Sequence, residues 1–75
     1  MKSLIEFIAK SIVDDPTEVW VTEENRGADV LLELSVAEED MGRVIGRNGR
    51  VANAMRVLLR VAAARSGVRA TLDIP

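Results

Sequence analysis

The chain has 75 residues, of which 48% are hydrophobic and 29% are charged, and its formal net charge is −2. It has no cysteine and no histidine, which excludes disulfides, thiolate or imidazole metal sites and nucleophilic cysteine chemistry. Because no apolar run reaches about 18 residues, we expect no membrane span, and we expect residues 1–75 to form one domain in a reducing cytoplasm.

The first segment is expected to form an amphipathic helix, because its apolar residues recur at helical spacing. A capping-box pattern at Ser3-Leu4-Ile5-Glu6 predicts the start of this helix, and Asp14-Asp15-Pro16 predicts its end. Glu6 and Lys10 interrupt the apolar run, so a signal peptide is not expected. The predicted buried residues of this helix are Leu4, Ile5, Ile8, Ile12 and Val13.

Two strands are expected next, joined as a hairpin. Residues 17–24 are rich in Val, Trp and Thr and predict a strand on which Trp20 is half-buried. Residues 25–27 predict a turn, because they end in glycine. Residues 28–36 alternate apolar and polar side chains, which is the period of a half-buried strand.

The C-terminal half predicts two helices and a third strand. A short helix is expected over about residues 38–45, with acidic side chains at its N-terminus. Residues 46–49 interrupt the helical pattern, and a longer helix is expected over residues 50–65, with Gly67 as its terminator. Residues 68–74 predict the last strand. The predicted core stripe of the long helix consists of Val51, Met55, Leu58, Leu59 and Ala62.

The predicted order of elements is helix, strand, strand, helix, helix, strand. The third strand follows the second after a helical crossover of about thirty residues, which suits parallel pairing. We therefore predict an α+β fold in which a three-stranded mixed sheet carries three helices on one face.

Charge is divided unevenly between the two halves of the chain. Residues 1–40 hold eleven acidic and three basic side chains, a net charge of −8, whereas residues 41–72 hold seven arginines and no acidic residue. Arginine presents a planar fork of donors suited to phosphate, so this half is a candidate anion-binding surface. The alternative is that these arginines are solvated or pair with the acidic half of the same chain.

The stretch Gly46-Arg47-Asn48-Gly49 lies between the two predicted helices and is the strongest candidate for an anion site. Two glycines let the backbone turn tightly and approach a ligand closely. The N-terminus of the following helix offers unpaired N–H groups with partial positive charge. The stretch fits neither the P-loop nor the dinucleotide-binding fingerprint. A helix corner without a ligand is the alternative interpretation.

The run Val44-Ile45-Gly46-Arg47-Asn48-Gly49-Arg50 resembles the V/I-I-G-x-x-G-R/K signature of KH domains. The order of elements resembles the type II arrangement, and the whole chain, including DMGRVIGRNGR at residues 40–50, resembles the small bacterial KH proteins of the KhpA family. This resemblance implies binding of single-stranded RNA with modest sequence preference, through a loop that clamps about four nucleotides of backbone. It also implies partnership with a larger KH protein of the Jag/EloR type (KhpB), and roles in RNA chaperoning and in cell division, elongation or envelope growth.

The candidate RNA-binding residues are Arg43, Ile45, Gly46, Arg47, Asn48, Gly49, Arg50 and Val51. The two glycines shape the loop, its two inner residues reach phosphate or sugar, and the flanking arginines attract the strand. Ile45, Val51 and the hydrophobic edge of the second strand form the floor on which the bases lie. Phe7 and Trp20 are the only aromatic residues, so stacking on an aromatic platform, as in RRM and OB folds, is not expected.

A second apolar face is expected on the long helix, beside its core stripe. A helix with two apolar faces often buries both, so this face is predicted to contact a second copy of the chain or the larger KH partner. The alternative is that one sheet covers a broad apolar arc. The residues of this face are Ala54, Val57, Val61 and Ala64, and Leu58 lies near the boundary between the two faces and is included among the candidate contact residues.

Other functions remain open at this point. The protein could act mainly as a protein-interaction module, with RNA binding secondary, or it could bind single-stranded DNA. An enzyme is not expected, and no catalytic residue, metal or cofactor is assigned. The acidic clusters at residues 14–15 and 38–40 could attract a hard cation, but adjacent residues seldom converge on one ligand.

Overall fold

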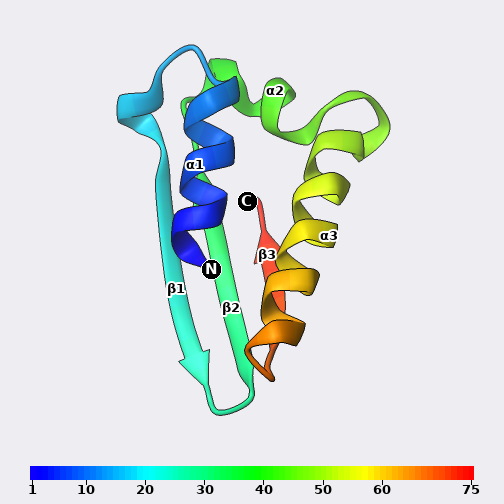
Figure 1. Cartoon of the computed structure of the whole chain (residues 1–75). Coiled ribbons are helices and arrows are strands. Elements are labelled where there is room, and N and C mark those ends of the chain that lie inside the picture. The colour runs from blue at the N-terminus through cyan, green and yellow to red at the C-terminus, as the bar shows by residue number, and fades with distance from the viewer.

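The computed structural model describes residues 1–75 and has the predicted order of elements (Figure 1). The helices are α1 (Lys2–Ile12), α2 (Met41–Ile45) and α3 (Arg50–Arg65), and the strands are β1 (Trp20–Arg26), β2 (Asp29–Ser35) and β3 (Arg69–Asp73). Short 3-10 turns lie at Pro16–Glu18, Glu38–Asp40 and Arg47–Gly49. The bounds of α3 are those predicted.

β2 is the central strand of a mixed sheet with the order β1-β2-β3. It pairs antiparallel with β1, where Val21 lies opposite Leu34, and parallel with β3, where Leu32 lies opposite Leu72. α1 and α3 lie side by side on one face of this sheet, and α2 lies at one end of it (Figure 1). The predicted α+β fold, with a three-stranded mixed sheet and three helices, is confirmed.

The core lies between the sheet and the helices. β2 alternates as predicted, and Val30, Leu32 and Leu34 point inward with exposures of 4% or less. The other elements add Ile5 and Ala9 of α1, Val44 of α2, and Met55 and Leu59 of α3. Burial of this contiguous cluster is the main favourable contribution to folding. Because Val44 belongs to it, α2 gives a fixed base to the glycine loop that follows.

β1 begins later than predicted, because a turn intervenes. Pro16–Glu18 form a 3-10 turn, and the carboxylate of Asp15 accepts a hydrogen bond of 3.2 Å from a backbone N–H within it. Proline fixes φ and cannot donate to a sheet, so the strand starts only at Trp20. At its far end β1 extends to Arg26, which leaves a loop of two residues before β2.

The C-terminal end of α3 is as predicted, whereas the N-terminal end of α1 is not. α3 closes with a Schellman motif, in which Gly67 takes a φ of +72° and the Val68 N–H donates to the Ala63 carbonyl at 3.0 Å. The capping box predicted for α1 is wrong. The helix starts one residue before Ser3, Met1 occupies the N-cap position, and no side chain caps the end.

Two predictions of burial are wrong. Trp20 is 65% exposed, because it points to the face of the sheet that carries no helix, whereas the next residue, Val21, points into the core. Leu58 is 50% exposed. It precedes the buried Leu59, and one residue turns the side chain about 100° around a helix. The core stripe of α3 therefore runs through Ala52 rather than Leu58.

Candidate nucleic-acid interface

The glycine loop at residues 46–49 makes a sharp turn between α2 and α3 (Figure 1). Gly46, Asn48 and Gly49 have φ values of 76°, 57° and 75°. The Gly46 N–H donates to the Gly42 carbonyl at 2.9 Å, and the Gly49 N–H donates to the Gly46 carbonyl at 3.1 Å. Asparagine enters the left-handed region more readily than most residues. The loop is thus fixed by its own backbone and by the residue types present.

Gly46 is required sterically as well as conformationally. A Cβ at this position would lie 2.5 Å from Val51 Cγ2 and 2.8 Å from the Val51 backbone nitrogen. Val51 packs against the core, so it cannot simply move away. This close approach holds the loop against the first turn of α3 and leaves the side chains of Arg47 and Asn48 exposed.

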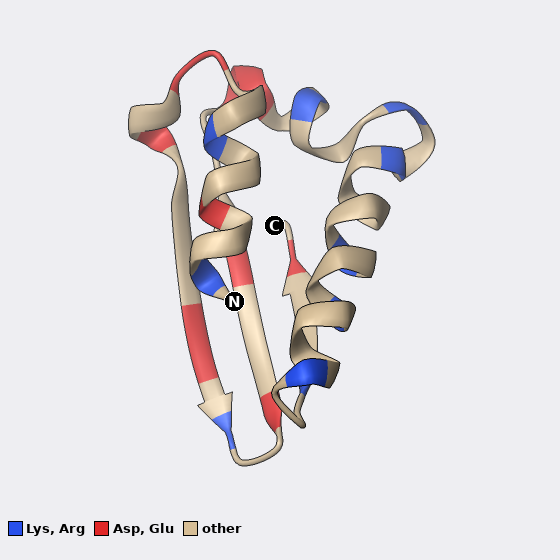
Figure 2. Ribbon diagram, viewed as in Figure 1, with Lys and Arg blue, Asp and Glu red and all other residues tan.

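Arg47 and Arg50 are exposed and form no ion pair or hydrogen bond with other side chains. They lie at the N-terminus of α3, which has no side-chain cap and carries the positive end of the helix dipole. Figure 2 shows basic residues along the loop and α3, and acidic residues gathered on β1, β2 and the turns beside α1. This end of the molecule can therefore attract an anionic chain.

Arg43 differs from the two loop arginines, because acidic groups of the same chain hold it. Its Nη2 lies 3.0 Å from Asp14 Oδ2, and its Nε lies 3.7 Å from Asp40 Oδ1. The Arg43 side chain remains 54% exposed. Its charge is compensated in large part, whereas the charges of Arg47 and Arg50 are not.

Asp40 is the one buried charged residue, with an exposure of 2%. Its carboxylate accepts hydrogen bonds of 3.1 Å from the backbone N–H groups of Asp14 and Asp15. The acids at 38–40 lie at the N-terminal end of α2, as predicted, but Asp40 makes no side-chain capping bond to that helix. Asp40 instead fastens the turn after α1 to the start of α2. No group of three acidic side chains is placed to hold a metal ion.

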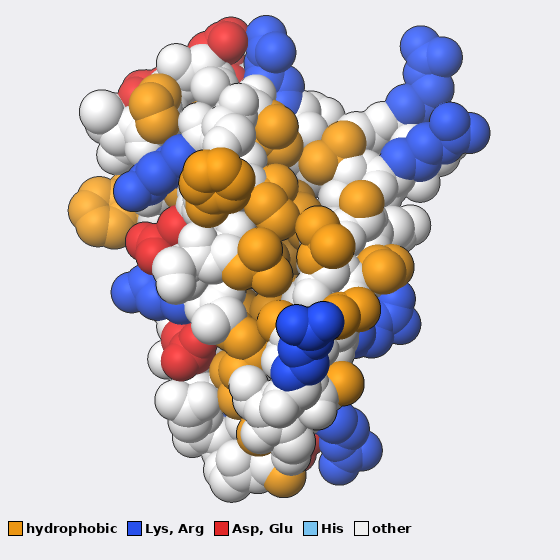
Figure 3. All heavy atoms as spheres, viewed as in Figure 1, with side chains coloured by type: hydrophobic (Ala, Val, Ile, Leu, Met, Phe, Trp, Pro, Cys, Tyr) orange, Lys and Arg blue, Asp and Glu red, His pale blue; other side chains and the backbone are white.

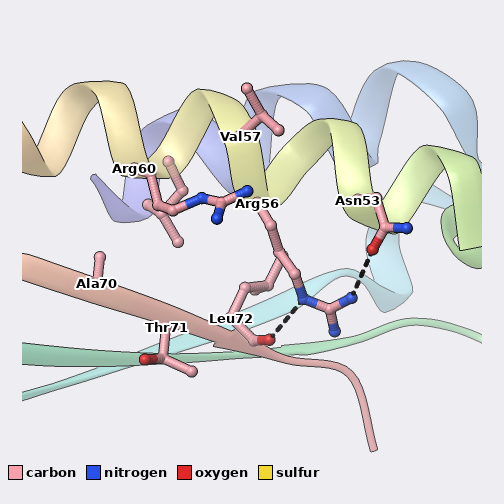
Figure 4. A pocket seen from close by; sticks show the side chains of 8 residues that line it. Asn53, Arg56, Val57, Arg60, Ala70, Thr71 and Leu72 are labelled. Carbon is pink, nitrogen blue, oxygen red and sulfur yellow. Dashed lines mark hydrogen bonds between the residues drawn. The ribbon is translucent and has the colours of Figure 1, made fainter.

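A groove of about 560 Å³ runs between α3 and β3 (Figure 4). β2, whose hydrophobic edge we predicted to border the binding groove, is paired along both edges, and β3 is the strand that faces α3. Ile45 and Val51, the predicted floor, do not line this groove; Ile45 is 38% exposed, and Val51 packs on the core. The lining residues are Asn53, Arg56, Val57, Leu59, Arg60, Ala70, Thr71 and Leu72.

Sequence reasoning missed the polar groove residues of α3, which are Asn53, Arg56 and Arg60. A signal was available, since they follow Gly49 at helical spacing and so share one side of the helix. The groove residues of β3 had no such signal. Which strand edge stays open depends on the sheet order, and that order is set by packing across the whole domain.

The second apolar face predicted on α3 is exposed. Val57, Leu58 and Val61 have exposures of 50%, 50% and 52%, and Ala54 beside them is exposed as well. Figure 3 shows hydrophobic side chains gathered over α3 and the neighbouring α1. None of the helices has the length and apolar character needed to cross a membrane. This face is therefore an uncovered apolar surface of the isolated chain.

The sheet, the helices on one face of it, and the tight glycine turn between α2 and α3 are the architecture of a type II KH domain, in which a helix and a strand precede the strand-helix-helix-strand unit. The chain belongs to the family described as KhpA/KhpB, KH domain, whose sequence profile matches residues 2–74. No solved structure matches the chain significantly.

Several bacterial proteins named RNA-binding protein KhpA are similar to this chain over nearly its whole length. The protein of Clostridium acetobutylicum is 49% identical over 74 residues, which cover 99% of both chains. The protein of Clostridium perfringens is 45% identical over 74 residues, which again cover 99% of both chains. That of Treponema pallidum is 45% identical over 73 residues, which cover 97% of this chain and 91% of the relative.

Proposed function

We propose that the protein binds single-stranded RNA, with the backbone of the strand at the glycine loop and its bases in the α3–β3 groove. The observation that carries this proposal is that the uncompensated arginines, Arg47 and Arg50, stand beside a sterically enforced glycine turn at one end of an open groove. The names of the relatives, RNA-binding protein KhpA, support the same function. The binding unit is the single domain formed by residues 1–75.

The roles within the site follow from its geometry. Phosphate groups pair with Arg47 and Arg50 and lie near the amides at the start of α3. Asn48 reaches sugar or phosphate, and Gly46 and Gly49 keep the backbone low enough for contact. Ile45 and Arg43 border the loop on the α2 side. The footprint at the loop is about four nucleotides, as in other KH domains.

The groove offers backbone groups to the bases. The Arg69 N–H donates to the Ala28 carbonyl at 2.8 Å, so this residue faces β2. Successive residues of a strand alternate in direction, so Ala70 and Leu72 turn their N–H and carbonyl groups toward the open edge. Arg56 already donates to the Leu72 carbonyl, and the other edge groups are unpaired. Unpaired edge groups next to a cationic groove suit recognition of splayed-out bases, which is how single-stranded RNA is read.

The decisive experiment compares two variants with the same change in net charge. Arg47→Asp with Asn48→Asp places acids in the loop, and Lys2→Asp with Ser3→Asp places them on the exposed first turn of α1. We expect the loop variant to lose at least about tenfold in affinity for a labelled single-stranded RNA, measured by fluorescence anisotropy, while the α1 variant keeps its affinity. If the loop variant is folded, as judged by thermal melting, and still binds as the parent does, the loop is not the site.

A second candidate function is protein interaction through the exposed face of α3. We propose that Ala54, Val57, Leu58 and Val61 contact a second copy of the chain or a KhpB-type protein, since an exposed apolar stripe on a small domain favours burial. We propose that the protein acts in the cytoplasm as a binding protein and not as an enzyme. We further propose that it is an RNA chaperone or post-transcriptional regulator linked to cell growth and envelope functions. Cross-linking to RNA in cells, with and without an intact loop, separates RNA binding from protein interaction as the main role.

A further inference from the structure

Of the two arginines that line the groove, Arg56 is held in place and Arg60 is not. Arg56 Nε donates to the Leu72 carbonyl oxygen at 3.2 Å, and its Nη1 donates to Asn53 Oδ1 at 3.4 Å. Figure 4 shows the guanidinium lying between α3 and the edge of β3. A guanidinium fixed by two bonds presents its remaining donors in one orientation, with less entropy to lose when a ligand binds.

The hydrogen-bonding groups that Arg56 itself leaves free are all donors. The unused N–H groups of its guanidinium are on the adjacent nitrogens Nη1 and Nη2. The Leu72 carbonyl and Asn53 Oδ1 each already accept a hydrogen bond from Arg56. Asn53 Nδ2 and the outward-facing Leu72 N–H add further donors. This part of the groove therefore suits a ligand edge that carries acceptors side by side.

The four RNA bases differ in this respect. Guanine presents O6 and N7 together, and the free Watson–Crick edge of cytosine presents N3 and O2 together. Adenine places its amino donor beside N7, and in uracil an N–H separates the two carbonyl oxygens. An adenine amino group directed at the Arg56 fork would face N–H donors instead of an acceptor, so the hydrogen bonds of this pair would be lost.

We propose that Arg56 is a specificity-determining residue that favours guanine or cytosine over adenine and uracil in the α3–β3 groove. This inference rests on the proposed RNA-binding function and extends it from backbone binding to base selection. Arg56 acts here as a planar fork, which lysine cannot replace.

The test uses oligo-uridine strands that carry one central guanine, cytosine or adenine, with uniform oligo-uridine as the fourth strand. We expect the parent protein to bind the guanine or the cytosine strand about tenfold more tightly than the adenine strand, as bidentate base contacts do. Arg56→Lys keeps the charge and should reduce this ratio to below about twofold. Arg65→Lys, an exposed residue in the last turn of α3 outside the groove, should leave the ratio unchanged.

The results separate base selection from RNA binding. Equal binding of all four strands by the parent, or a preference that survives in a folded Arg56→Lys variant, overturns the proposal and leaves the RNA-binding function standing. Absence of binding to every strand overturns both. If Arg56→Lys does not fold, the parent alone decides. Replacing the central guanine with 7-deazaguanine, which lacks N7, should abolish a guanine preference, and replacing the central cytosine with 3-deazacytosine, which lacks N3, should abolish a cytosine preference. Persistence in either case defeats the proposal.

Discussion

Arg43 and Asp14 are 29 residues apart in the chain and are joined by an ion pair of 3.0 Å between Nη2 and Oδ2. Both side chains are largely exposed, at 54% and 75%, so the pair contributes little to stability. Its effect falls on the site instead, because it neutralises a guanidinium one helical turn before the glycine loop. The protein thus holds an acidic group of its own where a phosphate could bind.

Removing that carboxylate should strengthen RNA binding. We expect Asp14→Asn to raise the affinity for short single-stranded RNA about two- to threefold at low salt, because Arg43 becomes available to phosphate. The free energy of unfolding should change by less than about 0.5 kcal/mol. Fluorescence anisotropy and urea denaturation measure the two effects. Glu33→Gln, which removes an exposed acid from β2, is the control; an equal gain there would mean that net charge alone is responsible.

Adding one methyl group to Gly46 should damage both fold and site. In Gly46→Ala the new Cβ would lie 2.5 Å from Val51 Cγ2, and the residue would have to keep a φ of +76°. We therefore expect the free energy of unfolding to fall by about 1–3 kcal/mol, and we expect RNA affinity to fall as well. Gly42→Ala, in α2 with open space around it, should instead raise stability by up to about 1 kcal/mol. Thermal melting measures the stability of both variants against the parent protein. A Gly46→Ala variant with parental melting and binding would show that the loop tolerates a Cβ.

Asp40 should be far more important for folding than its acidic neighbours. Asp40→Ala leaves the backbone N–H groups of Asp14 and Asp15 without their acceptor, and we expect a loss of about 2–3 kcal/mol. Glu39→Ala removes an exposed acid one residue away and should change stability by less than about 0.5 kcal/mol. Chemical denaturation of the two variants measures the difference, and similar values would exclude the fastening role described for Asp40.

The salt dependence of RNA affinity should report the small number of charges at the loop. Two or three phosphate contacts predict a slope of about −1.4 to −2.1 in a plot of log affinity against log salt concentration, at about −0.7 per contact for single strands. Arg47→Ala should reduce the slope by about 0.7. Asn48→Ala should weaken binding without changing the slope, since it removes no charge. A steeper slope for the parent protein would mean that further arginines contact the phosphates of the RNA.

Charges on the apolar face of α3 should prevent association. In sedimentation, Val57→Glu with Val61→Glu should be monomeric where the parent is a dimer, because both side chains are half exposed on that face. Thr22→Glu with Ser35→Glu adds the same charge to exposed positions on the sheet and should sediment as the parent does. A parent that is monomeric at all concentrations, or a dimer that survives the α3 changes, argues against a role of this face in self-association.

Local patterns were sufficient to predict much of the fold. The alternation of Val30, Leu32 and Leu34 predicted the central strand, and Gly67 predicted the end of α3. The start of β1 was missed because Asp15 and a proline form a turn whose hydrogen bonds compete with the sheet. The correct prediction for the end of α3 and the wrong one for the start of β1 have the same cause, because hydrogen bonds between residues close in sequence decide where an element begins or ends.

The site was predictable only in part for a different reason. The glycine loop is contiguous in sequence, so its residues could be recognised together. The groove joins Arg56 to Leu72, 16 residues further along the chain, and depends on β3 lying beside β2 in the sheet. The pairing of Arg43 with Asp14 is likewise a product of the folded arrangement. No periodicity in the chain encodes contacts of this kind.

The open edge of β3 has a consequence for solubility. An unpaired strand edge is a template on which a strand from another molecule can add, and proteins avoid this with charged or obstructing side chains. Here Arg56 occupies the Leu72 carbonyl, and Arg69 and Asp73 place charges at the two ends of the strand. A strand from a neighbouring chain would have to displace the Arg56 guanidinium before it could extend the sheet. Arg56, which lies in the groove, therefore also opposes aggregation through the edge of β3.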